Sequence, residues 1–200
     1  MMMDTTVLLV RHAAPVLPVA GDPPHVDNER PLTGEGRRTA GDLARRIARL
    51  PIAAIYSSPC RRALETVEPL AAELKLEIRF REDLAERWLA DRILPDHEWL
   101  DVFRRTWEDI DFCPQGGESR RTTQDRALAA LQDLRLKHRG ETVVGSTHGG
   151  LLGCLLLALD GKLRFEDALS MPTPAVFSLK HRNDRWHRSS PPISLLPSNS

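Results

Sequence analysis

The stretch "VLLVRHAAP", residues 7–15, decides the fold expected of this chain. Its first four residues are Val and Leu, with polar residues before them and a proline beyond, a pattern typical of a strand buried on both faces. Arg11 and His12 follow the apolar run directly, and the small residues Ala13 and Ala14 come next. The strand would therefore present a guanidinium and an imidazole at its C-terminal end, where small residues let the backbone turn closely around an oxyanion.

The composition is that of one ordinary globular domain. The chain has 200 residues, of which 41% are hydrophobic and 28% charged, and its 28 basic residues balance 28 acidic ones. A neutral chain gives no basis for binding nucleic acid or an anionic membrane, so any positive site has to be local. The longest apolar run, residues 151–159, is shorter than the roughly 20 residues that span a bilayer, and the N-terminus lacks the basic region of a signal peptide. We expect a cytoplasmic protein.

The three cysteines, Cys60, Cys113 and Cys154, are odd in number and widely spaced. Without a CxxC pair they predict neither a disulfide framework nor a zinc site, and we expect all three to be packing residues. The sequence also shows no cluster of carboxylates and no Cys/His ligand set. We therefore expect a protein that needs neither a metal nor another cofactor.

Strands and helices alternate along most of the chain. After the first strand, further strands are expected at "IAAIYSS" (residues 52–58), "LEIRF" (76–80) and "ETVVGST" (141–147), and helices at about 33–50, 58–74, 118–137 and 148–161. Such alternation predicts a three-layer α/β/α sandwich with a mostly parallel sheet. The segments "AVFSLKH" and "RWHR" flank "RND" near the C-terminus and predict a hairpin at the sheet margin.

Two helix starts carry capping signals. Thr33 is expected to cap the helix that Pro51 stops. Ser58 is expected to cap the next helix, with Pro59 in its first turn.

Three segments lack a regular pattern. Residues 13–31 are rich in Pro, Gly and Asp and predict an irregular surface loop. Residues 81–117 hold three of the four tryptophans and predict an irregular cap packed over the sheet. Residues 189–200, rich in Ser and Pro, predict a disordered tail. We therefore expect a single domain over residues 1–188.

Ligands of parallel sheets bind outside the C-terminal ends of the strands. That rule singles out residues 11–12, 57–62 and 147–149. Within them, Arg11 and Arg62 supply cationic forks, His12 and His148 supply imidazoles, and the Gly149 amide lies where a helix begins. These groups around one cavity would bind an anion such as inorganic phosphate or a small phosphorylated substrate.

A histidine in such a site can also act as a nucleophile. Neutral imidazole attacks at physiological pH when its other ring nitrogen donates to a backbone carbonyl, here one in the chain after Ala13. Phosphoryl transfer to His12 then needs charge stabilisation of the phosphoryl oxygens, from Arg11, Arg62 and His148. The expected product is a phosphohistidine.

The leaving alkoxide also needs a proton, and "FREDLAERW", residues 80–88, offers Glu82, Asp83 and Glu86. We favour Glu86, because the flanking Leu84 and Trp88 would desolvate its carboxyl group and raise its pKa toward that of a working acid.

The ordered pieces of the sequence resemble the histidine phosphatase superfamily, the phosphoglycerate-mutase-like fold. The resemblance rests on "LLVRHA", "RPLTGEGRRTAGDLA", "IYSSPCRRALETVEPLA", "LAERW", "GGES" and "VVGSTHGG", and it spans about residues 7–179. It implies that His12 is the phosphorylated nucleophile, that Arg11, Arg62 and His148 form the phosphate pocket with Gly149 as a backbone donor, and that Glu86 is the proton donor. It also makes "GGES", residues 116–119, a structural turn.

The chain departs from the mutase pattern. Mutases continue after the histidine with Gly, a hydroxyl residue and Asn, whereas this chain has Ala13, Ala14 and Pro15, and it lacks the inserted segments of mutases. "RHA" is similar to the smaller phosphatases, including those that act on phosphohistidine proteins.

The favoured function is a metal-independent phosphomonoesterase for a small phosphorylated metabolite. The alternatives are a phosphoglycerate-type mutase, a phosphohistidine-protein phosphatase, and a phosphate-binding module without turnover. Substrate and oligomeric state stay open, with a homodimer through the sheet margin as one option.

Overall fold

The protein is built on one mixed sheet of six strands, as seen in a computed structural model in which residues 4–188 are described. The strands are β1 (Thr5–Arg11), β2 (Ile52–Ser57), β3 (Ile78–Phe80), β4 (Thr142–Thr147), β5 (Ala175–Arg182) and β6 (Arg185–Arg188), in the order β3-β2-β4-β1-β5-β6. The first four strands are parallel, and β5 and β6 are antiparallel neighbours at one side. The predicted C-terminal hairpin is thus confirmed. The tail predicted for residues 189–200 lies outside the described residues.

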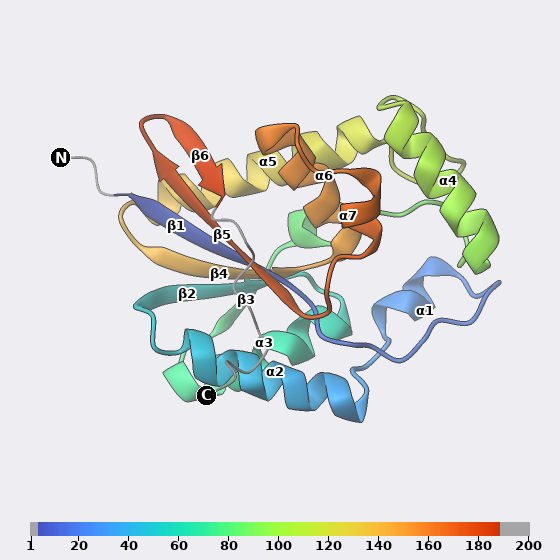
Figure 1. The fold of residues 1–200 in the computed structure, drawn as a ribbon. Coiled ribbons are helices and arrows are strands. Elements are labelled where there is room, and N and C mark those ends of the chain that lie inside the picture. The colour runs from blue at the N-terminus through green and yellow to red at the C-terminus, as the bar shows by residue number, and fades with distance from the viewer. Residues whose placement is uncertain (1–3, 189–200) are drawn as a thin grey trace.

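Helices cover both faces of the sheet, which confirms the predicted three layers. Figure 1 shows α2 (Gly34–Ile47) and α3 (Arg61–Leu74) on one face, and α5 (Arg120–Lys137) and α6 (Gly149–Asp160) on the other. No helix within residues 4–188 is long and apolar enough to cross a membrane.

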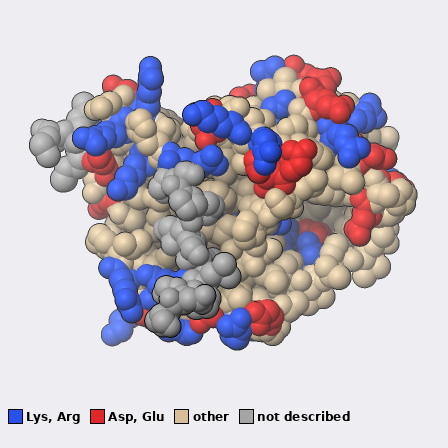
Figure 2. Space-filling model, viewed as in Figure 1, with Lys and Arg blue, Asp and Glu red and all other residues tan. Residues whose placement is uncertain are grey.

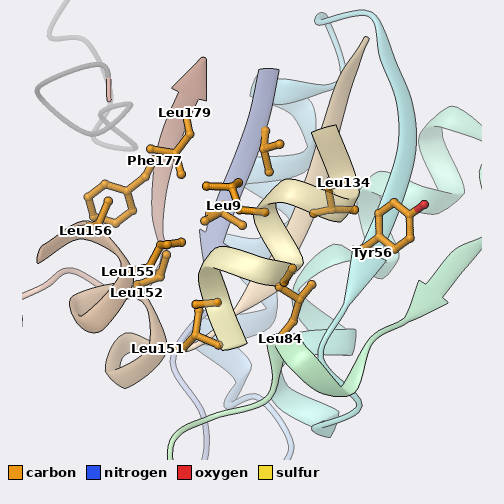
Figure 3. Packing of buried hydrophobic residues seen from close by; sticks show 14 of the residues in the cluster. Leu9, Tyr56, Leu84, Leu134, Leu151, Leu152, Leu155, Leu156, Phe177 and Leu179 are labelled. Carbon is orange, nitrogen blue, oxygen red and sulfur yellow. The ribbon is translucent and has the colours of Figure 1, made fainter. Parts of the chain in front are cut away.

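The apolar run that opens the chain is buried on both faces of β1. Val7 and Leu9 belong to the core cluster beneath α5 and α6, which Figure 3 shows from close by. Leu8 and Val10 alternate with them and belong to the second core cluster, beneath α2 and α3. Because successive side chains of a strand point to opposite faces, a strand between two helical layers has to be apolar throughout.

The two predicted helix caps have different outcomes. The Thr33 side chain accepts a hydrogen bond from the Gly36 N–H at 3.0 Å, which confirms the cap of α2. The prediction for Ser58 is wrong, because α3 starts only at Arg61, with Cys60 at its N-cap position. The Ser58 hydroxyl instead accepts from the Cys60 N–H and lies 2.7 Å from a ring nitrogen of His148.

The segments expected to be irregular contain helices. Residues 13–31 include the short α1 (Pro24–Asn28), and residues 81–117 include a 3-10 turn (Glu82–Leu84) and the 13-residue α4 (Asp96–Glu108). Helix α4 packs Phe103 and Trp107 against Phe165 of α7 (Phe165–Leu169), at the margin of the molecule in Figure 1. The expectation of an irregular cap over the sheet is therefore wrong for this helix.

The cysteines are free, as expected from their spacing. Cys60 and Cys154 are buried, but Cys113 is exposed, so the packing role predicted for all three is wrong for Cys113.

Candidate active site

The C-terminal ends of β1, β2 and β4 lie side by side and bring the predicted site residues together. The His12 N–H donates to the carbonyl of Thr147 at 3.0 Å, and the Ser58 N–H donates to the carbonyl of Ser146 at 2.9 Å. These bonds extend the parallel pairing of β4 with both of its neighbours by one residue. The chain segments that carry His12, Arg62 and His148 therefore start from a common edge of the sheet.

His12 is held as a neutral ring with one nitrogen aimed by the backbone. Its Nδ1 lies 2.8 Å from the carbonyl oxygen of Ala13, and because a carbonyl only accepts, Nδ1 carries the proton and Nε2 keeps a free lone pair. The ring is 6% exposed. Burial, and next the positive charge of Arg62, lower the pKa of His12 to about 3.

His148 lies directly beside His12. The centroids of the two rings are 5.1 Å apart, with an interplanar angle of 62°. His148 is fully buried at the N-cap position of α6, and its Nε2 lies 2.7 Å from the Ser58 hydroxyl. Burial, and next Arg62, hold its pKa well below the ordinary histidine value. Its Nδ1 has no hydrogen-bond partner.

Two guanidinium groups are fixed at the same place by other parts of the chain. Arg11 donates to the carbonyl of Met171, and burial lowers its pKa. Arg62, 1% exposed, donates to the carbonyl of Asp27 at 2.6 Å and forms an ion pair with the Asp27 carboxylate at 2.9 Å. In both residues Nε is buried without a partner. Among the described residues, the buried side-chain nitrogens and oxygens without a partner are these two atoms and His148 Nδ1.

Gly149 packs beneath Arg11. A Cβ at this position would lie 3.0 Å from the Cζ of the Arg11 guanidinium. Glycine therefore lets the guanidinium lie flat against the first turn of α6.

Glu86 is the member of the three candidate acids that reaches the site. Its carboxylate accepts from the N–H groups of Arg87 at 2.8 Å, Leu151 at 3.2 Å and Gly150 at 3.4 Å, the last two in the first turn of α6. Glu82 and Asp83 do not line the cavity, and Asp83 is paired with Arg81.

The surroundings expected for Glu86 are wrong in part. Leu84 points into the core on the α5 and α6 side, as Figure 3 shows, and does not line the cavity. The hydrogen-bond donors to the Glu86 carboxylate are the N–H groups of Arg87 and of Gly150 and Leu151 at the start of α6. Trp88 does line the cavity beside it.

A cavity of about 360 Å³ opens above these groups. Arg11, His12, Arg62 and Glu86 line it, whereas His148 and Gly149 lie behind its surface. Figure 2 shows a hollow on the right of the molecule, between the positions of α1 and α4 in Figure 1, with basic and acidic side chains inside it. The described residues contain no group of three or more His, Cys, Asp or Glu side chains placed to hold a metal ion.

Sequence reasoning missed several residues that organise the site. Asp27 is buried and bridges Arg62 and Arg30, with its carboxylate 2.6 Å from the Arg30 guanidinium. Thr66 accepts the Ala13 N–H at 2.9 Å and so fixes the turn after His12. Thr66 lies four residues after Arg62, on the same helix face, which is a usable signal. Asp27 lies in a segment without periodicity, so the sequence gives no comparable signal for it.

Fold and site together define an α/β protein whose anion site is built around an uncharged histidine at the C-terminal edge of the sheet. The chain belongs to the histidine phosphatase superfamily, branch 1, whose family model matches residues 7–190. The resemblance inferred from the motifs is thereby confirmed.

Individual relatives support the same placement. The chain is 34% identical over 174 residues to "Phosphoglycerate mutase-like protein 4" of Arabidopsis thaliana, covering 81% of this chain and 73% of that protein. It is 30% identical over 168 residues to "Metal-independent phosphoserine phosphatase" of the same organism, covering 78% and 68%. The solved complex of mycobacterial glucosyl-3-phosphoglycerate phosphatase with inorganic phosphate superposes with a TM-score of 0.77, at 25% identity, over 95% of this chain and 98% of that one.

Proposed function

We propose that the protein is a metal-independent phosphomonoesterase that hydrolyses a small phosphorylated metabolite through a phosphohistidine on His12. Phosphoric monoester hydrolysis is the activity that the family and its phosphatase-named relatives support. The observation that carries the proposal is the set of three buried nitrogens without a partner, Arg11 Nε, Arg62 Nε and His148 Nδ1. Buried donors left unpaired are costly, and the oxygens of a phosphoryl group would satisfy all three.

The first step forms a bond between His12 Nε2 and phosphorus and breaks the bond from phosphorus to the leaving oxygen. His12 suits this role because its Nε2 lone pair is free while Nδ1 donates to Ala13. Arg11, Arg62 and His148 stabilise the negative charge on the phosphoryl oxygens. Glu86, in its protonated form, gives its proton to the leaving alkoxide.

The second step hydrolyses the phosphohistidine. The Glu86 carboxylate takes a proton from water, the resulting hydroxide oxygen bonds to phosphorus, and the bond from His12 Nε2 to phosphorus breaks. Inorganic phosphate leaves, His12 regains its lone pair, and Glu86 is again protonated. The N–H groups at the start of α6 hold the carboxylate in place between the two steps.

The test is turnover of p-nitrophenyl phosphate in the presence of EDTA. We expect hydrolysis by the wild type and a loss of at least about 1000-fold in His12→Ala, because His12 Nε2 is the atom that forms the bond to phosphorus. His97→Ala, which removes an exposed histidine on α4, is the matched control and should retain wild-type turnover. Undiminished turnover in His12→Ala would reject the nucleophile assignment.

The same preparation separates the alternative functions. A mutase would interconvert 2- and 3-phosphoglycerate once primed, and a phosphohistidine-protein phosphatase would favour a phosphoprotein over small esters. A binding module would bind vanadate without hydrolysing any ester. Each result differs from that expected of the proposed phosphatase.

Two further parts of the proposal concern the setting of the protein. We place it in the cytoplasm, which is supported by the three free cysteines. A homodimer would use an edge of the sheet, β3 or β6, and sedimentation of the purified chain tests it.

A further inference from the structure

The cavity has two chemically different parts. Its floor is polar and holds His12 and Arg62, which are buried, and Arg11, which is half-buried. One wall comes from residues 88–99 and is mostly apolar, with Trp88, Leu89, Ala90, Ile93, Leu94 and Trp99 facing the space. In Figure 2 uncharged surface lies below the hollow, acidic side chains lie along its right margin, and basic side chains lie inside it. A phosphoryl group on the floor places the leaving group of the substrate against this wall.

Trp99 forms a rigid flat surface on the wall. Its ring stacks on Phe103 with centroids 4.9 Å apart and an angle of 11° between the planes. Phe103 is itself buried and packs against Phe165 at 5.6 Å, so the indole rests on a fixed support. Trp99 is nevertheless 40% exposed and lines the cavity. A held aromatic ring with free surface stabilises a second ring by stacking.

Two guanidinium groups on this side of the cavity, those of Arg87 and Arg92, have partners within the protein. Arg92 lies 2.9 Å from the Glu98 carboxylate. Arg87 donates to the carbonyl of Glu118 at 3.0 Å and to the Thr106 hydroxyl at 3.1 Å. Unlike Arg11 and Arg62 on the floor, Arg87 has no buried nitrogen without a partner.

A carboxylate also lines the wall without a counter-charge. Asp96 faces the cavity and forms no ion pair with any residue of the range 4–188. A substrate carboxylate would therefore meet repulsion from Asp96, and the nearby guanidinium groups of Arg87 and Arg92 already have partners.

The apolar surface continues past the rim of the cavity. The loop that supplies Pro15 and Pro18 to the lining exposes Val16, Leu17 and Val19, which are 44%, 84% and 64% exposed. Two backbone hydrogen bonds tie this loop to the wall, from the Gly21 N–H to the carbonyl of Ile93 and from the Ile93 N–H to the carbonyl of Asp22. Apolar side chains on both sides of an entrance fit an apolar group that reaches out of the cavity.

We propose that the preferred phosphomonoester carries an uncharged, aromatic leaving group that lies against Trp99, rather than a second negative charge. The proposal rests on the phosphatase activity argued above and names the substrate class of that same site.

The test compares three primary-alkyl phosphates, so that the leaving oxygen is chemically similar in each. They are 2-(1-naphthyl)ethyl phosphate, ethyl phosphate and 3-phosphoglycerate. We expect kcat/KM for the naphthyl ester to exceed that of both others by at least tenfold. In Trp99→Ala and in Trp99→Leu, which keeps apolar packing on Phe103, the ratio of kcat/KM for the naphthyl ester to that for ethyl phosphate should fall about tenfold, through KM.

Trp107→Phe is the matched control. Trp107 belongs to the same aromatic cluster, 5.9 Å from Phe103, but does not line the cavity, so its replacement should keep the ratio. Equal kcat/KM for the three esters, or a ratio that Trp99→Leu leaves unchanged, would overturn the proposal.

A binding measurement separates this proposal from the proposed function. The phosphonate analogue of the naphthyl ester should bind the wild type at least tenfold more tightly than ethylphosphonate, by calorimetry, and Trp99→Leu should remove the difference. If no ester is hydrolysed but this difference in binding is found, the proposed phosphatase function is wrong and the preference for an aromatic group is supported. If esters are hydrolysed without any difference in binding, the substrate class is wrong and the phosphatase stands.

Discussion

At the scale of single residues, the site depends on two histidines that burial keeps uncharged. His12 and His148 have lowered pKa values because both are buried next to Arg62. A protonated His12 would have no lone pair on Nε2, so the low pKa preserves, in mildly acidic solution, the lone pair that the proposed nucleophile needs. Neither burial nor the partner carbonyl of Ala13 can be inferred from the dipeptide alone. The sequence indicated the position of His12, and only the packing explains its charge state.

The lowered pKa of His12 predicts a pH-dependent stability. Between about pH 6.5 and pH 3 the unfolded chain binds a proton at this histidine that the folded protein does not. Stability therefore falls as pH decreases through this window, with a slope from one such group of up to about 1.4 kcal/mol per pH unit. Urea unfolding of the wild type and of His12→Asn at several pH values measures it.

Below pH 6.5 the free energy of unfolding should depend on pH more steeply in the wild type than in His12→Asn. Above pH 6.5 the two profiles should be parallel. His97→Asn, at an exposed position, should retain the wild-type slope. Parallel profiles of wild type and His12→Asn from pH 4 to 8 would show that the folded pKa is not lowered.

The role assigned to Glu86 predicts a dependence on the leaving group. Glu86→Gln keeps the size of the side chain and removes the transferable proton, so hydrolysis of ethyl phosphate should fall about 100- to 10000-fold. Hydrolysis of p-nitrophenyl phosphate should fall much less, because its leaving oxygen needs little protonation. Steady-state rates with the two esters measure the difference, and an equal loss with both would contradict the acid role.

At the scale of elements, the starts of α2 and α6 hold the loops of the site. Gly36 in the first turn of α2 leaves room for the carbonyl of Ala14, because a Cβ there would lie 2.2 Å from that oxygen. The same carbonyl accepts from the N–H and hydroxyl of Thr33, at 3.0 and 3.1 Å. The start of α2 is thereby fixed to the turn that follows His12.

This close approach predicts opposite effects for two substitutions in one helix. Gly36→Ala should destabilise the protein by about 1–3 kcal/mol, because the backbone has to shift to admit the methyl group. Gly41→Ala should stabilise it by roughly 0.5–1 kcal/mol, since its Cβ would meet only the flexible end of Arg45, at 3.6 Å. Denaturant unfolding of both variants measures the pair. Equal effects would show that the Gly36 contact carries no energy.

Most strands and helices could be predicted from local signals in the sequence. The strands of the sheet and helices α2, α5 and α6 follow from apolar runs and caps such as Thr33. Helix α4 was missed although Trp99, Phe103 and Trp107 recur every fourth residue, a helical spacing. The Ser58 cap was wrong because that hydroxyl is used by His148, which is distant in the sequence. Local pattern carries no information about such a partner.

At the scale of the whole molecule, the order of the strands creates the anion site. Placing β4 between β1 and β2 brings three strand ends to one edge, and the general rule for ligands of parallel sheets was enough to predict which residues meet. The rule could not supply Asp27 or the wall of residues 88–99, because these reach the cavity from long connections whose path depends on tertiary packing. The chemistry of the floor was therefore predictable, and that of the walls was not.

Binding of phosphate at the shared edge should stabilise the whole fold. At a phosphate concentration of 100 times Kd, the free energy of unfolding should rise by about 2.7 kcal/mol and Tm by about 5–10 °C. Arg62→Met removes one of the three donors and should abolish most of the shift, while Arg45→Met, exposed on α2, should leave it intact. Thermal melts in phosphate and in chloride of equal ionic strength measure it. A shift that survives in Arg62→Met would place the anion elsewhere.

The two backbone hydrogen bonds that join Ile93 to Gly21 and Asp22 have a consequence for how this protein can diverge. Main-chain atoms make both bonds, so almost any residue except proline at position 93 preserves them. The entrance of the cavity can therefore keep its width while single side chains of the loop and of the wall are replaced. Substitutions at the entrance can therefore change which substrates are selected without any change in the residues on the floor of the cavity.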